Sequence, residues 1–190
     1  MRIKINKKTI FFTLLLISVS MFVFPKKVSV YDACSKNKRY LTMADTEAQD
    51  IMEALNDGLK KAKDCLPNSF YSKITDELNN RFLNIYINCN EPANGCAGTQ
   101  PNTKTMKGEW VDLNKKNFWE HPHCKCKDMT LMHELLHWSG IYPTGEDDDE
   151  IRAWSCNVKC YKDDKRKCLE FIPQKYKDKA KPELCCESEK

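Results

Sequence analysis

Residues 130–140 read TLMHELLHWSG and contain two histidines, His133 and His137, with Glu134 directly after the first. The apolar residues around them, and Gly140 just beyond, are typical of a helix that ends at a glycine, which readily adopts the left-handed conformation. On such a helix, residues four positions apart project from the same face, about one turn from each other. The stretch therefore predicts a helix that presents two imidazoles side by side.

Two imidazoles in this arrangement can bind one tetrahedral zinc ion. Glu134 lies one step further round the helix, where its carboxylate can reach a water at the metal but cannot easily join the histidines as a ligand. Zinc lowers the pKa of such a water and polarises a peptide carbonyl, while a carboxylate takes the proton and passes it to the leaving amine. The alternative is a chance pair of histidines, since a His-Glu-x-x-His pentapeptide arises by accident in about one chain in a few hundred of this length.

The flanking segments predict the elements around this helix. We expect Asp128 or Thr130 to cap it and Trp138 to be its last residue. Upstream, hydrophobic spacing and turn residues predict helices over Thr46–Leu66 and Phe70–Asn79, a strand over Phe82–Cys89, a loop over 90–108 that Cys89 and Cys96 could close, and a strand over Trp110–Leu113. With a closing helix after the histidines, this order predicts an α+β fold with a short mixed sheet and disulfide staples.

The pentapeptide His133-Glu134-Leu135-Leu136-His137 resembles the signature of the zincin zinc metallopeptidases. The upstream stretch WVDLNKKNF is similar to the strand ahead of the active-site helix in several zincin families. The resemblance covers residues 109–160, and only the pentapeptide is specific. It implies a small zincin-like domain in which His133 and His137 bind zinc and Glu134 is the general base.

The third ligand of such a site has to come from further along the chain. Metzincins place a histidine or aspartate where this chain has Pro143. Gluzincins use a glutamate from a following helix, which EIRAWSC offers at Glu150, and aspzincins use an aspartate at a spacing that falls here on Glu146. We therefore expect a gluzincin-like or aspzincin-like site with Glu150 as third ligand, and Glu146 and Asp147 as alternatives.

The remaining residues of this segment have supporting roles. In a helix that starts near Glu150, Ala153, Trp154 and Asn157 share its face. We expect the other acids between residues 146 and 150 to begin the helix or face solvent. Tyr142 and Trp154 are candidates for a substrate pocket or for stabilising an oxyanion, although aromatic residues are more often part of a core.

All 11 cysteines follow residue 33, and exported chains meet oxidising conditions that favour disulfides. The odd number leaves at least one free, lipidated or bonded to another chain. In HPHCKCKD, from His121, the residues His123, Cys124 and Cys126 could add a second metal site, but disulfides at both cysteines are expected instead. Cys156 and Cys160 should pair elsewhere, with residues such as Cys168, Cys185 or Cys186, because cysteines four apart on a helix do not bond to each other without distortion.

Residues 1–33 are predicted to be an export segment, which leaves 34–190 as one domain. Basic residues precede an apolar run, Ile10–Phe24, that is too short to cross a bilayer comfortably. Cleavage is expected near Ser20, near Val30 or after Ala33, with an uncleaved anchor as the alternative. Residues 34–190 hold 25 basic and 26 acidic side chains, a net charge of −1, so nucleic-acid binding is not predicted.

Together these patterns predict an exported zinc metalloendopeptidase, periplasmic, on the cell surface or extracellular, which hydrolyses a peptide or protein lying along an edge strand. Contact with a membrane is expected only through a retained N-terminal segment. The first alternative is a secreted cysteine-rich binding or structural protein, with no metal or with a zinc site closed by Cys124 or His123. A toxin-like effector protease is the second, and the sequence does not separate its substrate from those of other proteases.

Overall fold

The computed structural model describes residues 27–89, 95–102, 104–143 and 146–186, and for Cys186 the backbone alone. Five strands of this part form one mixed sheet in the order β2-β1-β3-β5-β4. They are β1 (Val28–Asp32), β2 (Arg39–Tyr40), β3 (Leu83–Asn88), β4 (Ala97–Asn102) and β5 (Lys107–Asn114). The three central strands are parallel, and β2 and β4 run antiparallel to their neighbours at the two edges of this sheet.

The central strands bury one face of the sheet. In β3, Leu83, Ile85 and Ile87 are buried and alternate with half-exposed residues. Ile85 lies opposite Val111 of β5, and Ile87 lies opposite Leu113, so the apolar side chains of the two strands form one surface. This alternation confirms the strand that was predicted from the period-two pattern.

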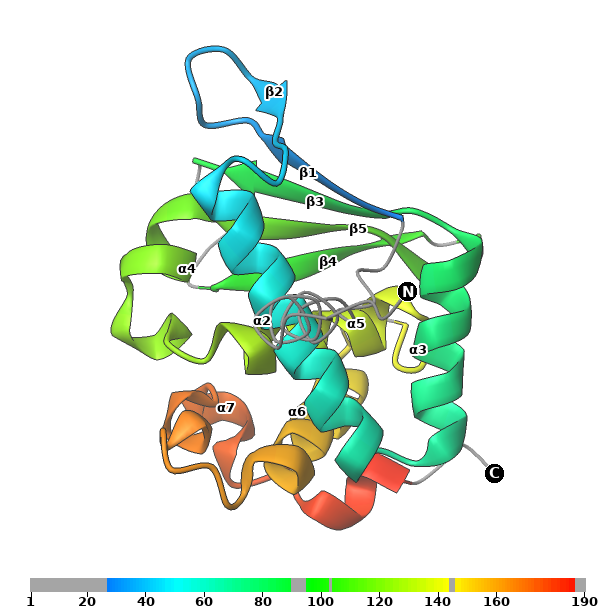
Figure 1. Cartoon of the computed structure of the whole chain (residues 1–190). Coiled ribbons are helices and arrows are strands. Elements are labelled where there is room, and N and C mark those ends of the chain that lie inside the picture. The colour runs from blue at the N-terminus through cyan, green and yellow to red at the C-terminus, as the bar shows by residue number, and fades with distance from the viewer. Residues whose placement is uncertain (1–26, 90–94, 103, 144–145, 187–190) are drawn as a thin grey trace, which may run out of the picture.

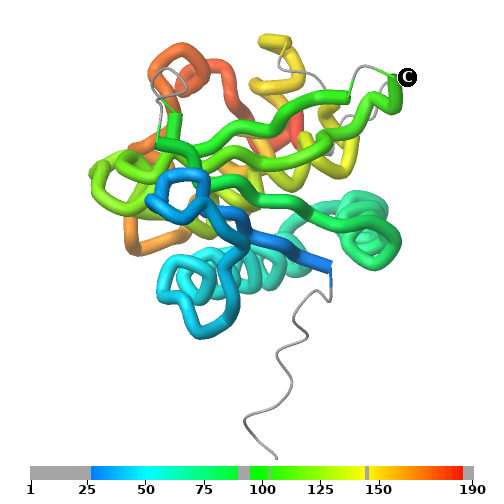
Figure 2. Tube along the Cα trace, turned by 90° about the horizontal axis from the view of Figure 1, so that it is seen from above, coloured from blue at the N-terminus to red at the C-terminus, as the bar shows by residue number. Residues whose placement is uncertain are grey.

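The other regular elements of the described part are helices and short 3-10 turns. They are α2 (Thr46–Cys65), α3 (Asn68–Asn80), α4 (Lys115–Glu120), α5 (Lys127–Trp138), α6 (Asp147–Tyr161) and α7 (Gln174–Lys177), with 3-10 turns η1 (Pro122–Cys124), η2 (Cys168–Phe171) and η3 (Pro182–Cys186). Of these, α5 packs against β4 and β5 of the sheet. Figure 1 shows α2, α5 and α6 below the sheet. From above, α2 lies toward the β1 side, and the orange C-terminal segments lie toward β4 (Figure 2).

The core lies between the sheet and these helices, and α2 crosses closely over the start of α5. Ile51 and Leu55 of α2 are fully buried. Gly58 permits the crossing, because a Cβ atom there would lie 2.7 Å from the carbonyl oxygen of Asp128. The chain is therefore a small α+β domain, as the sequence predicted. No helix in the described ranges has the length and apolar character that a membrane span requires.

The N-terminal boundary needs a correction. Residues 28–32 were assigned to the export segment, but they form β1, which pairs with β3 from Val28 to Asp32. The folded unit therefore starts at or before Val28 and not at Cys34. Val30 is buried in the core, and removal of the chain up to Ala33 would take this strand out of the sheet. The apolar run Ile10–Phe24 lies outside the described residues.

The loop predicted over 90–108 is also partly wrong, since Ala97–Asn102 form the edge strand β4. Glycine and proline in AGTQPN disfavour a strand, but β4 pairs with β5 along most of its length. The register shifts between Gln100 and Pro101, and a proline is tolerated at an edge because it needs no partner for an amide proton. Pairing with β5, which spans Lys107–Asn114 and not only Trp110–Leu113, overrides the local preference.

In the described part of the chain, ten cysteines form five disulfides: Cys34–Cys89, Cys65–Cys160, Cys96–Cys124, Cys126–Cys168 and Cys156–Cys185. Cys124 and Cys126 are thus in disulfides, as expected, and Cys156 pairs with one of its predicted partners. The suggested Cys89–Cys96 bridge is wrong, because β3 and β4 are separated by β5 in the sheet. Five disulfides indicate an oxidising, exported environment.

Candidate metal centre and cleft

The histidine segment forms α5, whose last residue is Trp138 as predicted; Ser139 caps it, and Gly140 follows with a φ of +72°. The left-handed glycine was predicted, and it lets the amide of Ile141 return to the carbonyl of Leu136 at 3.1 Å. The predicted cap is wrong, because the residue before the helix is Cys126, which is bonded to Cys168. Asp128 lies in the first turn, where it accepts hydrogen bonds from Arg166.

His133 and His137 are 4% and 5% exposed, and their Nε2 atoms lie 3.2 Å apart. The Nδ1 atom of His137 lies 2.6 Å from the backbone carbonyl of Tyr142. A carbonyl can only accept, so Nδ1 carries the proton and Nε2 keeps a free lone pair for a metal ion. The turn after α5 therefore orients one of the two imidazoles.

The third group comes from α6, which begins inside the acidic run. Four acids occupy its first turn, a favourable place for negative charge at a helix N-terminus. Of these, Glu150 reaches the histidines: its Oε2 atom lies 3.3 Å from Nε2 of His133, and its Oε1 atom 3.4 Å from Nε2 of His137. Glu146 precedes the helix and Asp147 pairs with Lys175, so neither alternative joins the cluster.

One such group of metal-binding side chains occurs in the described part of the chain, namely His133, His137 and Glu150. Their ligand atoms all lie within 4.8 Å of one another. The residues expected from the sequence are thus brought together by two different helices. This cluster could hold a metal ion.

The electrostatic surroundings favour the protonation states that a metal ion needs. Burial lowers the pKa of His137, and the nearby His133 lowers it further, so the ring is neutral near pH 7. Burial would raise the pKa of Glu150, but the hydrogen bond from His133 and the charges of both histidines outweigh it and lower this pKa to about 2. A neutral imidazole, as at His137, and an ionised carboxylate, as at Glu150, are forms that bind metals.

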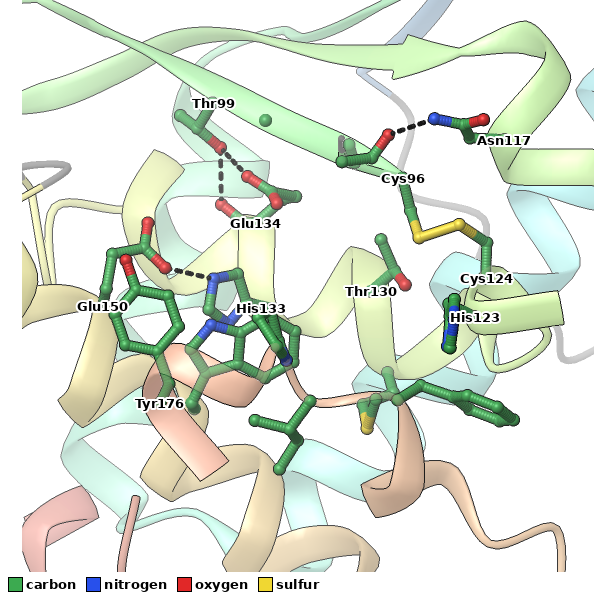
Figure 3. Close-up of a pocket in the computed structure, with 18 of the residues that line it drawn as sticks. Cys96, Thr99, Asn117, His123, Cys124, Thr130, His133, Glu134, Glu150 and Tyr176 are labelled. Carbon is green, nitrogen blue, oxygen red and sulfur yellow. Dashed lines mark hydrogen bonds and ion pairs between the residues drawn. A yellow bond between two sulfur atoms is a disulfide. The ribbon is translucent and has the colours of Figure 1, made fainter. Parts of the chain in front are cut away.

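Glu134 lies beside this cluster and does not belong to it. Its side chain is buried, and Oε2 accepts a hydrogen bond from the hydroxyl of Thr99 in β4 at 2.8 Å. Burial raises the pKa of Glu134 to about 7, although His137 and Thr99 act in the opposite direction. Such a carboxyl group can exchange a proton near neutral pH. Figure 3 shows Glu134 close to His133, below Thr99.

A cleft of about 970 Å³ opens over these residues. One wall is formed by β4 and the two residues before it, Gly95 and Cys96, and the opposite wall is the segment from Glu170 to Lys177. β4 has a strand neighbour, β5, on one side only within the described sheet. Its other edge lies along the cleft, where Thr99 contacts Glu134. The cleft can therefore take an extended chain beside an edge strand.

The structure separates the two aromatic candidates. Trp154 lines the cleft, and its ring lies 4.1 Å from that of His133, centroid to centroid. The expected role of Tyr142 in a substrate pocket or oxyanion site is wrong. Its side chain is buried and its hydroxyl donates to the carbonyl of Cys185 at 3.1 Å, so it packs in the core. The sequence reasoning missed Tyr176, which lines the cleft from α7 near Glu150 (Figure 3). No local motif marks Tyr176, because it enters the cleft only when the C-terminal segment folds back.

The second metal site weighed for the HPHCKCKD segment is not formed in the described ranges. Cys124 and Cys126 are in disulfides, and His121 and His123 have no third ligand near them. Both histidines line the cleft instead.

Comparisons of the chain with protein-family models, with curated proteins and with solved structures found no match.

Proposed function

We propose that this protein is an exported zinc metalloendopeptidase of zincin type. The observation that carries the proposal is the joining of His133, His137 and Glu150 from two helices, with the buried carboxyl group of Glu134 beside them, on the floor of a cleft with an edge strand. Each part alone is common in proteins. Their combination matches the requirements for hydrolysis of an extended peptide.

The distances between the three ligands suit zinc. Two ligands of one tetrahedral zinc ion lie about 3.3–3.4 Å apart, because Zn–N and Zn–O bonds are about 2.0–2.1 Å long. The Nε2 atoms of His133 and His137 lie 3.2 Å apart, close to this value. Glu150 approaches each imidazole with a different oxygen, Oε2 at 3.3 Å from His133 and Oε1 at 3.4 Å from His137, and with one ligand atom per residue the three atoms lie within 4.8 Å of one another. Two imidazoles and a carboxylate also form a donor set of the kind found in catalytic zinc sites, where one position stays open for water or substrate.

A bound zinc ion would activate a water molecule and polarise the carbonyl of the peptide bond. Glu134 would accept the proton of that water and deliver it to the nitrogen of the departing amine. Thr99 holds Oε2 of Glu134 through its hydroxyl, so the direction of the general base is set by the strand that borders the substrate. The same strand would pair with the backbone of the substrate and place its peptide bond over the metal.

The alternative of a structural zinc site requires a fourth protein ligand. Cys124 was the first candidate for it, but its sulfur is bonded to Cys96. His123 lies at the other end of the cleft from Glu150 (Figure 3) and is not a member of the cluster. These positions favour an open site, and so they favour the catalytic proposal over a structural one.

The test is cleavage of a peptide library by the purified chain, with its zinc content measured on the same sample. Wild type should bind one zinc ion per chain and cleave peptides, lose cleavage when a chelator removes the metal, and recover it when zinc is restored. Glu134→Gln should keep the metal and lose about 10²–10⁴-fold in rate, the range that general acid–base catalysis supplies. Unchanged cleavage by Glu134→Gln would refute the proposed mechanism.

A further inference from the structure

The cleft has two chemically different ends. The proposed metal ligands and Glu134 lie at one of them, near Thr99, and we call it the metal end. At the other, the start of β4 is attached to the segment 115–124: Cys96 is bonded to Cys124, and the side-chain amide of Asn117 donates to the carbonyl of Gly95 at 3.1 Å. Figure 3 shows this arrangement, with Thr130 between the two ends. We call the second one the far end of the cleft.

Three cleft-lining residues of the segment 115–124, which is joined to Gly95 and Cys96 at the far end, can donate hydrogen bonds: Lys116, His121 and His123. All three are exposed, and the two imidazole rings stack with their centroids 4.9 Å apart. The Nδ1 atom of His121 accepts a hydrogen bond from the backbone amide of His123 at 3.2 Å. A neutral imidazole that accepts at Nδ1 carries its proton at Nε2, so His121 offers an N–H group even when uncharged.

The positive charge of Lys116 has no carboxylate partner in the described part of the chain. Of the carboxyl groups in the cleft, Glu134 and Glu150 belong to the metal end. Glu170 lies in the opposite wall, and its carboxylate is paired with Lys167 at 3.6 Å. The far end therefore has an excess of donors over acceptors, which suits an anionic group of a ligand.

We propose that Lys116, His121 and His123 form a subsite that binds a carboxylate of the substrate. This inference rests on the proposed peptidase function and specifies its substrate class. A peptide paired antiparallel with β4 would run from the Asn102 end toward the Ala97 end, so its C-terminal part reaches the far end. The carboxylate belongs to an Asp or Glu side chain after the scissile bond, or to the C-terminus of the peptide.

The first test uses one cleavable peptide sequence in matched versions. Glu or Gln is placed in turn at each position after the scissile bond, and each peptide is made with a free and with an amidated C-terminus. At one position, Glu should be cleaved about three- to tenfold faster than Gln, the effect of one partly exposed charge pair. A preference for the free C-terminus alone would identify the terminal carboxylate as the ligand. Equal rates throughout would overturn the subsite.

Lys116→Glu should reverse the preference, so that a Lys in the peptide is favoured over Glu. The substitution is compatible with folding, because Lys116 is exposed in the first turn of α4, where an acid is favourable. The matched control is Lys125→Glu, which makes the same charge reversal next to η1 at an exposed residue outside the cleft lining. This control should keep the wild-type preference, and a preference that Lys116→Glu leaves unchanged would refute the role of Lys116.

Binding separates the subsite from the catalytic proposal. The same peptides are titrated into zinc-loaded Glu134→Gln, and the acidic versions should bind about three- to tenfold more tightly than the Gln and amide versions. If they do so while wild type cleaves nothing, the subsite is correct and the peptidase function is wrong. If wild type cleaves but neither binding nor rate depends on the carboxylate, the function stands and the subsite is wrong.

Discussion

The two ends of the cleft differ in how their side chains are held. At the metal end, His133, Glu134 and His137 are at most 5% exposed, and their positions are set by the packing of α5 and α6. At the far end, His121 and His123 are exposed, and a disulfide and one side-chain amide hold their segment to β4. Buried groups in a packed core keep a fixed geometry, which a catalytic site requires. Exposed side chains can be substituted without loss of packing in the core.

The largest expected effect concerns the metal end. Glu150→Gln should weaken zinc binding by more than the 10- to 100-fold that loss of an outer partner typically costs, because a charged ligand is removed. Cleavage should disappear with the metal. The matched control is Asp148→Asn, which removes an exposed acid from the same first turn of α6. Zinc titrations of the two variants should differ sharply, and equal affinities would exclude Glu150 as a ligand.

The second prediction compares a disulfide beside the cleft with one that lies away from it. Removal of the Cys96–Cys124 bridge, which spans 28 residues, should cost about 3–4 kcal/mol of unfolding free energy. Removal of Cys65–Cys160, which spans 95 residues, should cost more, about 4–5 kcal/mol.

The Michaelis constant should follow the opposite order, because loss of Cys96–Cys124 should raise it more than loss of Cys65–Cys160. Cys96 is next to β4 and lines the cleft, whereas Cys65 and Cys160 lie in α2 and α6 outside it. Both orders can be tested with variants in which the two cysteines of one pair are replaced by serine. Denaturant unfolding gives the loss of stability, and peptide cleavage below the unfolding transition gives the Michaelis constant. A Michaelis constant that rises equally in both would show that the bridge at β4 has no special role in the cleft.

A smaller effect is expected at the hydrogen bond between Thr99 of β4 and Glu134 of α5. Thr99→Val removes the hydroxyl that donates to Glu134 but keeps the shape of the side chain. The rate at saturating substrate should fall about tenfold, which corresponds to about 1.4 kcal/mol and is near the lower limit of the roughly 1.5–3 kcal/mol that a hydrogen bond to a charged group contributes. The Michaelis constant should change little. Thr99→Ser restores the hydroxyl and should recover the rate, and a serine variant as slow as valine would point to packing as the cause.

The sequence predicted the meeting of the His133, His137 and Glu150 side chains, and for the two histidines the information is local. His133, Glu134 and His137 lie within one helical turn, and the period of the helix alone places them together. Glu150 was the preferred third ligand because the next helix was expected to start near it; the helix starts at Asp147, and its first turn brings Glu150 to the histidines. The strand over residues 83–88 was likewise readable from its alternating apolar side chains.

The walls of the cleft were not predicted, because they depend on contacts between distant residues. β4 has weak local preference for a strand and exists through pairing with β5, while Tyr176 reaches the cleft from the C-terminal segment. Tyr142 was misplaced because the direction of its side chain follows from packing against Phe70 and the carbonyl of Cys185. β1 was missed because VSVYD follows the apolar run after only three residues, 25–27, and its partner β3 lies far along the chain.

X-ray absorption spectroscopy of the zinc-loaded protein tests the central claim most directly, since it reports the atoms bound to the metal. The account predicts one zinc ion per chain with nitrogen and oxygen ligands at about 2.0–2.2 Å, the imidazoles of His133 and His137 among them, and no sulfur. Glu150→Gln should change this spectrum, and Asp148→Asn should not. A sulfur ligand at about 2.3 Å, or a spectrum that does not change when Glu150 is replaced, would contradict the account.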